Sequence, residues 1–98
     1  MKEKMVNVAV QVLPVGQNKK SYDIVDAAIA VIDQSGVKYM VTPFETVMEG
    51  KYADLMEVVN QVQAVCYEAG ADSVMCYVKI QSRREGVVTI MDKMAKYE

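Results

Sequence analysis

The chain has 98 residues, 52% of them apolar, and a formal net charge of −2. This predicts one small globular domain over residues 1–98 and gives no bulk electrostatic reason to bind nucleic acid. The longest apolar runs are far shorter than the ~18 residues that a membrane span needs. The charged start, Met1–Lys4, leads straight into a strand pattern without a signal-peptide core, so we expect a cytoplasmic protein with no membrane partner.

The inventory of reactive side chains is small. There is no histidine, which removes the usual general base near neutral pH and the commonest metal ligand. Cys66 and Cys76 form no C-x-x-C, and their spacing favours small buried apolar residues over metal ligands or a disulfide. The eight methionines favour gap filling in the core and interfaces first, and pocket lining second. We therefore expect no catalytic residues, no metal site and no cofactor.

The first half of the chain predicts a strand, a helix and a hairpin. Alternation predicts a strand from Met5 to Leu13, which the segment Pro14–Asn18 breaks. Ser21 is a plausible N-cap for a helix that Gly36 ends as a left-handed C-cap residue. Strands follow over about Val37–Thr42 and Glu45–Glu49, and the short Pro43-Phe44 connection makes them antiparallel.

The second half repeats the order in reverse. Apolar residues at helical spacing predict a helix over about Tyr52–Ala69, which Gly70 ends, and alternation predicts a strand over Ser73–Gln81. Two such halves give an α+β, ferredoxin-like βαββαβ sandwich, with a four-stranded antiparallel sheet and both helices on one face. Thr89 and Asp92 resemble a capping box opening a short helix from Ile90 to about Tyr97. We expect that helix to dock on its own sheet or on a partner.

Helices on one face leave the other sheet face uncovered. It should carry a mixture of polar, methionine and tyrosine side chains: Asn7, Ala9, Gln11, Met75, Tyr77 and Lys79. Such a mixture suits a surface covered by another subunit better than a wet pocket, although both can hold at the edge of an interface.

The hairpin carries most of the polar side chains that could bind a ligand. Glu45 and Glu49 share one face of a strand, and ordinary solvation explains such carboxylates about half the time. Glu49 precedes Gly50, where the backbone can approach a ligand closely. Tyr39, Thr42 and Thr46 lie near the same turn. Arg83-Arg84 could bind phosphate, but a basic pair in a loop is more often solvated or paired with Glu85.

These residues resemble the small thiamine-binding proteins, a family of chains of about a hundred residues. The resemblance spans nearly the whole chain and is most specific over Thr42–Gly50 and Thr89–Met94. Val10–Pro14, Ser35–Tyr39, Glu68–Ala71, and Val78–Ile80 with Arg83-Arg84 add to it. Phe44-Glu45 departs from the pattern, because a small or flexible pair such as Met-Gly is expected there.

The resemblance implies a ferredoxin-like subunit that forms homodimers and often homotetramers through its sheets. It also implies binding of thiamine, or its hydroxymethylpyrimidine part, without chemistry. It carries over six ligand-binding positions: Gln11, Tyr39, Pro43, Thr46, Glu49 and Gly50. Glu49, Gln11 and Thr46 could hydrogen-bond the pyrimidine. A tyrosine face could attract the charged thiazolium by cation–π interaction.

Two other functions stay open at this point. The chain could be a structural oligomerisation module, whose exposed sheet face is only an interface. It could also be a regulatory or sensor domain for another small metabolite, in which case Arg83-Arg84 would matter most.

Overall fold

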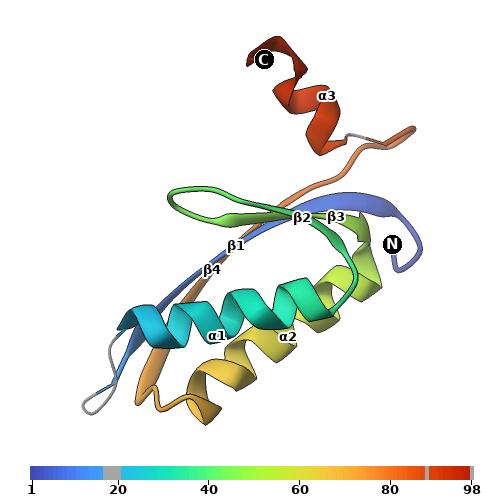
Figure 1. Ribbon diagram of the computed structural model, residues 1–98. Helices are drawn as coiled ribbons and strands as arrows, with labels where there is room; N and C mark the ends of the chain where they lie inside the picture. Colours follow the sequence, from blue (N-terminus) through green and yellow to red (C-terminus); the bar gives the residue numbers. More distant parts are fainter. Residues whose placement is uncertain (17–20, 88, 98) are drawn as a thin grey trace.

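The computed structural model describes residues 1–16, 21–87 and 89–97, so Gln17 and Asn18 of the expected break lie outside the described residues. A four-stranded antiparallel sheet has the order β2-β3-β1-β4. The strands are β1 (Met5–Val15), β2 (Lys38–Val41), β3 (Thr46–Lys51) and β4 (Ser73–Gln81). Helices α1 (Ser21–Gln34) and α2 (Tyr52–Glu68) lie together on one face, as Figure 1 shows. This is the expected ferredoxin-like plan.

The core lies between the sheet and these two helices. Val6, Val8 and Val10 of β1 and Met48 of β3 meet the apolar stripes of α1 and α2. The stripe residues are Ile24, Ala28 and Ile32 on α1 and Leu55, Val58, Val59, Val62 and Cys66 on α2. Burying such side chains contributes ~1.5–3 kcal/mol each, before the entropic cost of ordering the chain.

The predicted C-terminal ends of α1 and α2 are confirmed. Gly36 and Gly70 follow α1 and α2 with φ of 81° and 111°, the left-handed region in which glycine has no steric penalty. Ser21 is already the first residue of α1, one position later than its expected N-cap role, and its hydroxyl donates to the Pro14 carbonyl at 3.4 Å.

Strand β1 is longer than predicted. It was expected to stop at Leu13, but it continues to Val15 and stays paired with β4, with Pro14 opposite Val74. Pairing with β3 stops earlier, at Val10 opposite Thr46. A proline is tolerated in a strand where its missing N–H would point away from the paired neighbour, and here the side toward β3 is open.

The second sheet face is partly covered. Helix α3 (Ile90–Met94), followed by a 3₁₀ turn at Ala95–Tyr97, lies over the face opposite α1 and α2 (Figure 1). Ile90 is buried, and Asn7 on this face is buried as well. The terminal helix therefore docks on its own sheet, as one of the two expectations had it, and the expectation of an uncovered face is wrong at the Asn7 end. It holds toward the other end, where Met75 and Tyr77 are exposed.

In the part of the chain that the structure describes, the helices are too short and too polar to cross a membrane.

Candidate functional site

The turn between β2 and β3 is organised by one threonine. The Thr42 hydroxyl donates to the carbonyl of Glu45 at 2.6 Å and accepts from the Glu45 and Phe44 N–H groups at 3.0 and 3.4 Å. The Thr42 N–H also donates to the Glu45 carbonyl, at 2.9 Å. A threonine side chain that replaces a backbone partner in this way stabilises a tight turn. The turn therefore presents Pro43 and Phe44 at the tip of the hairpin in a defined geometry.

A groove lies between this turn, β1 and α1. Its volume is about 280 Å³, slightly below the ~300 Å³ at which small-molecule pockets commonly begin. Three of the sequence-predicted positions, Gln11, Pro43 and Thr46, line it. We call it the hairpin groove. In Figure 1 the tip of the β2–β3 hairpin extends away from β1 and β4.

The hairpin groove combines an apolar floor with polar and aromatic groups. The floor is formed by Val10, Val12, Val25, Ala28, Ile29, Ile32 and Val62. Thr46 also lines the groove and is only 6% exposed. Tyr22 of α1 and Phe44 of the turn also line the groove and are 83% and 80% exposed. Such an arrangement can bind a flat ring through apolar and aromatic contacts while polar groups fix its edge.

Tyr39 is turned toward α1 and not into the groove. Its hydroxyl donates to the Asp33 carboxylate at 2.7 Å, which raises the pKa of the Tyr39 phenol. The cause is the hydrogen bond to Asp33 first, then desolvation, then the negative charge of Asp33. Tyr39 thus fixes β2 to α1, and the structure does not place it with Gln11 and Thr46.

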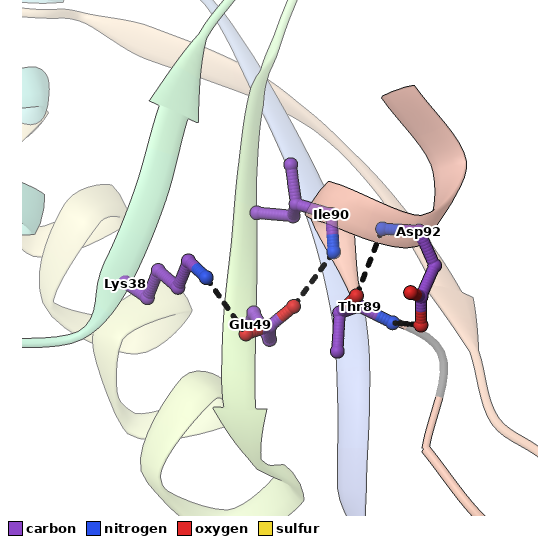
Figure 2. A network of polar contacts seen from close by, with 5 residues as sticks. All are labelled: Lys38, Glu49, Thr89, Ile90 and Asp92. Carbon is purple, nitrogen blue, oxygen red and sulfur yellow. Dashed lines mark hydrogen bonds and ion pairs between the residues drawn. The ribbon is translucent and has the colours of Figure 1, made fainter. Parts of the chain in front are cut away.

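The Glu49 carboxylate makes contacts within the protein (Figure 2). One carboxylate oxygen accepts the Ile90 N–H at 2.7 Å, and the other pairs with Lys38 at 3.6 Å. The Glu49 side chain is only 10% exposed. The predicted capping box is also present, since the Thr89 hydroxyl accepts from Asp92 N–H at 2.9 Å and the Asp92 carboxylate accepts from Thr89 N–H at 3.4 Å. Glu49 therefore ties the start of α3 to the sheet.

Gly50 shares a shallow polar cleft with Glu49, on the edge of the sheet near the start of α2. That cleft and the hairpin groove have no lining residue in common. The six sequence-predicted positions are therefore divided: Pro43 and Thr46 meet in the groove, Glu49 and Gly50 lie in the edge cleft, and Tyr39 is bonded to α1. Gln11 borders the groove, but strand alternation puts its side chain on the sheet face opposite Thr46.

A second hollow lies on the other sheet face under α3. This sheet-face cavity has a volume of about 340 Å³ and is lined by Asn7, Ala9, Met40, Thr42, Glu45, Val47, Lys79, Ile80, Gln81, Ile90, Lys93 and Met94. Its charged feature is the ion pair between Lys79 and Glu45 at 2.6 Å. Thr42 and Glu45 line both this cavity and the hairpin groove. The turn thus separates the two hollows.

The remaining candidates do not add a reactive site. Within residues 1–16, 21–87 and 89–97, acidic and cysteine side chains form no cluster that could hold a metal ion. Cys66 and Cys76 are free thiols, and burial raises the pKa of both. Arg83 and Arg84 are exposed between β4 and α3, where the Arg84 carbonyl accepts from the Lys4 ammonium at 3.0 Å. They line none of the three hollows.

Sequence reasoning missed the aromatic rim of the groove and its floor. Tyr22 sits in the first turn of α1, where the pattern signals only a helix start, and its approach to the hairpin depends on tertiary packing. Phe44 was predicted as part of the hairpin connection and as a departure from a family pattern, not as a ligand contact. An exposed aromatic residue in a tight turn is itself unusual enough to mark as a candidate contact.

Comparison with known proteins then identifies the family. The model of the thiamine-binding protein family matches residues 8–98. The chain belongs to this family. The matched range contains all six predicted positions, the hairpin groove and α3. A UPF0045 protein of Clostridium perfringens is 44% identical over 91 residues, covering 93% of this chain and 95% of that protein.

Two solved structures extend the family comparison. A domain of unknown function from Bacillus cereus superposes with a TM-score of 0.93 at 40% identity, covering 97% of this chain and 91% of that chain. A Thermotoga maritima protein, provisionally assigned to thiamine biosynthesis or salvage, superposes with a TM-score of 0.84 at 28% identity, covering 96% and 99%. These likenesses confirm the ferredoxin-like fold for this family member.

Proposed function

We propose that this protein binds thiamine, or its hydroxymethylpyrimidine moiety, in the hairpin groove and releases it unchanged, acting as a carrier, buffer or sensor of vitamin B1. One observation carries the proposal: in a chain of the thiamine-binding family, three of the predicted ligand positions line one groove rimmed by Tyr22 and Phe44. Two free thiols fit a reducing compartment, which supports placing this activity in the cytoplasm.

The chemistry of the groove suits this ligand. A pyrimidine ring needs an apolar floor, flat walls and a hydrogen-bonding group, which the valines, the two aromatic residues and Thr46 supply. The thiazolium carries a positive charge, and an exposed tyrosine or phenylalanine face attracts a cation by ~0.5–1 kcal/mol. The Glu45 carboxylate adds a negative charge at the turn, although its pairing with Lys79 offsets much of its field.

The first test is thermal unfolding and calorimetry with thiamine, hydroxymethylpyrimidine and thiamine diphosphate. A ligand at ten times its Kd adds about 1.4 kcal/mol to the native state, a rise in Tm of roughly 5–10 °C for a domain of this size. Thr46→Val should weaken binding about three- to tenfold by removing one hydrogen bond. Gln34→Leu, at an exposed residue at the end of α1 outside the groove, is the control. No Tm shift with any ligand at millimolar concentration would remove the proposed function.

We further propose that copies of the chain associate through the part of the open sheet face that α3 leaves bare. Support comes from Met75 and Tyr77, which are both exposed on adjacent positions of that face, with the Tyr77 hydroxyl donating to the Met75 sulfur at 2.8 Å. Sedimentation equilibrium of Tyr77→Lys against the unaltered protein tests this, since a cation in an apolar contact should shift the equilibrium toward monomer. An unchanged mass distribution would contradict it.

A further inference from the structure

Strand β1 has a strand on both sides for only part of its length. Its pairing with β3 runs from Met5 opposite Lys51 to Val10 opposite Thr46. Its pairing with β4 runs from Asn7 to Val15. Beyond Val10, the edge of β1 that faced β3 therefore has no strand neighbour within the described residues. This is where the hairpin turn leaves the sheet and the hairpin groove begins.

Two backbone hydrogen bonds show which residues of β1 direct their main-chain groups to that edge. Along a strand, successive residues direct their N–H and C=O alternately to one side and the other. The Lys4 carbonyl accepts from Tyr52 N–H at 2.9 Å, on the side where β3 leads into α2. The Val15 carbonyl accepts from Asp72 N–H at 2.6 Å, on the β4 side. Even-numbered residues of β1 therefore direct their main-chain N–H and C=O toward β3, and odd-numbered residues direct theirs toward β4.

This alternation singles out Val12. It is the first even-numbered residue after the last β3 pair, and it lines the hairpin groove. Its N–H and C=O therefore point into the groove, side by side. The next even residue is Pro14, which has no N–H and whose carbonyl accepts from the Ser21 hydroxyl at 3.4 Å. Val12 is thus the residue of this edge that offers the groove a donor and an acceptor together.

We infer that the main-chain N–H and C=O of Val12 bind the aminopyrimidine edge of the ligand, as a strand neighbour would. The inference rests on the proposed function. A 4-aminopyrimidine presents a ring nitrogen that accepts and, beside it, an amine that donates. The ring nitrogen accepts from Val12 N–H, and the amine donates to the Val12 carbonyl. Both partners are held by the β1–β4 pairing, so little ordering is needed when the ligand binds.

The geometry also sets the chemical class of ligand. The site selects flat heterocycles with an acceptor adjacent to an amine. In oxythiamine an oxo group replaces the amine, so the ring nitrogen beside it carries a hydrogen and the donor and acceptor exchange places. Such a ring can pair with Val12 only after turning over, which aims the carbon that carries the thiazolium the opposite way. A buried acceptor or donor left without its partner weakens binding, and we expect discrimination of about tenfold or more.

The test combines a backbone change with this pair of ligands. Val12→Pro removes the Val12 N–H but no bond to β4, as Pro14 already does two residues later. Val12→Ala shortens the same side chain and keeps the N–H, so it is the matched control. Calorimetry on the full chain measures thiamine and oxythiamine binding to all three proteins, and circular dichroism checks that each is folded.

We expect the unaltered protein and Val12→Ala to prefer thiamine by tenfold or more. Val12→Pro should bind thiamine at least about tenfold more weakly than Val12→Ala and lose most of that preference. Equal thiamine affinity in Val12→Pro and Val12→Ala would overturn the inference, as would equal affinity of the unaltered protein for both ligands. If Val12→Pro does not fold, the affinities of the unaltered protein for thiamine and oxythiamine test the inference alone. Failure of all ligands to bind would overturn the proposed function as well.

Discussion

Tyr39 shows how a residue expected in a binding site can serve the fold instead. Its hydroxyl donates to Asp33, six residues earlier at the end of α1, and so joins the first strand of the hairpin to the helix layer. The local sequence predicted that Tyr39 lies near the turn, but it did not predict which way the Tyr39 ring points. Its contribution to ligand binding remains a prediction that the groove geometry does not favour.

The Tyr39 contact predicts a pH dependence. The hydrogen bond to Asp33 raises the pKa of Tyr39 above 10.0 in the folded state. A group whose folded pKa is raised contributes stability that is complete below its unfolded pKa and is lost as pH rises through the folded value. Asp33→Asn should return the pKa toward 10.0, followed by NMR titration of the tyrosine Cζ signals. Asp26→Asn, an exposed change on the same helix, is the control. An unshifted Tyr39 titration in Asp33→Asn would refute this assignment.

Strand alternation at Thr46 and Glu49 explains why the predicted site divides. Residues three apart on a strand point to opposite faces. Thr46 lies opposite Val10 and points toward the helices, whereas Glu49 lies opposite Asn7 and points toward α3. The sequence stretch is continuous, but its side chains serve two different layers. This division follows from the strand period and could have been predicted once the strand was assigned.

At the scale of elements, α3 is a five-residue helix held mainly at its first residue. Ile90 is buried at 6% exposure, and its N–H is held by the Glu49 carboxylate, whereas Met91 and Tyr97 further along are exposed. A helix this short gains little from its own hydrogen bonds, so its docking depends on that attachment and on the capping box. The sequence predicted the helix and its cap, but not that Glu49 would receive it.

Glu49→Gln should release α3. The substitution removes the ion pair with Lys38 and replaces a charged acceptor of the Ile90 N–H with a weaker neutral one, at a cost of about 1 kcal/mol. Hydrogen exchange should quicken in residues 90–94 while α1 and α2 keep their protection. Glu68→Gln on the exposed face of α2 makes the same charge change as a control.

The affinity of the Glu49→Gln variant for thiamine provides a second test. If thiamine binds in the hairpin groove, Glu49→Gln should leave its affinity within about twofold, because Glu49 lies on the other sheet face. A large loss of affinity together with unchanged exchange at α3 would show that Glu49 contacts the ligand. That result would restore it to the binding site.

At the scale of the whole molecule, the periodicity of apolar residues in the sequence was sufficient to predict the architecture. Alternation in β1 and β4 and the apolar stripes of the helices specify which face each element buries, and the two glycines mark where the helices end. Short connections between consecutive elements then favour the ferredoxin-like order. The hairpin groove could not be predicted in the same way. It exists because β3 pairs with β1 only as far as Val10 while β4 continues to Val15, a difference of register between distant strands.

The central claim, that thiamine binds in the hairpin groove, is tested most directly by titrating the ¹⁵N-labelled protein with thiamine and following its amide signals. The account predicts saturable shifts at Tyr22, Val12, Thr42 and residues 44–46, with the largest at Val12 if its N–H is a donor. Ala9, Lys79 and Ile90, around the sheet-face cavity, should move little. Saturable shifts confined to those three residues would place the ligand under α3 and contradict the account.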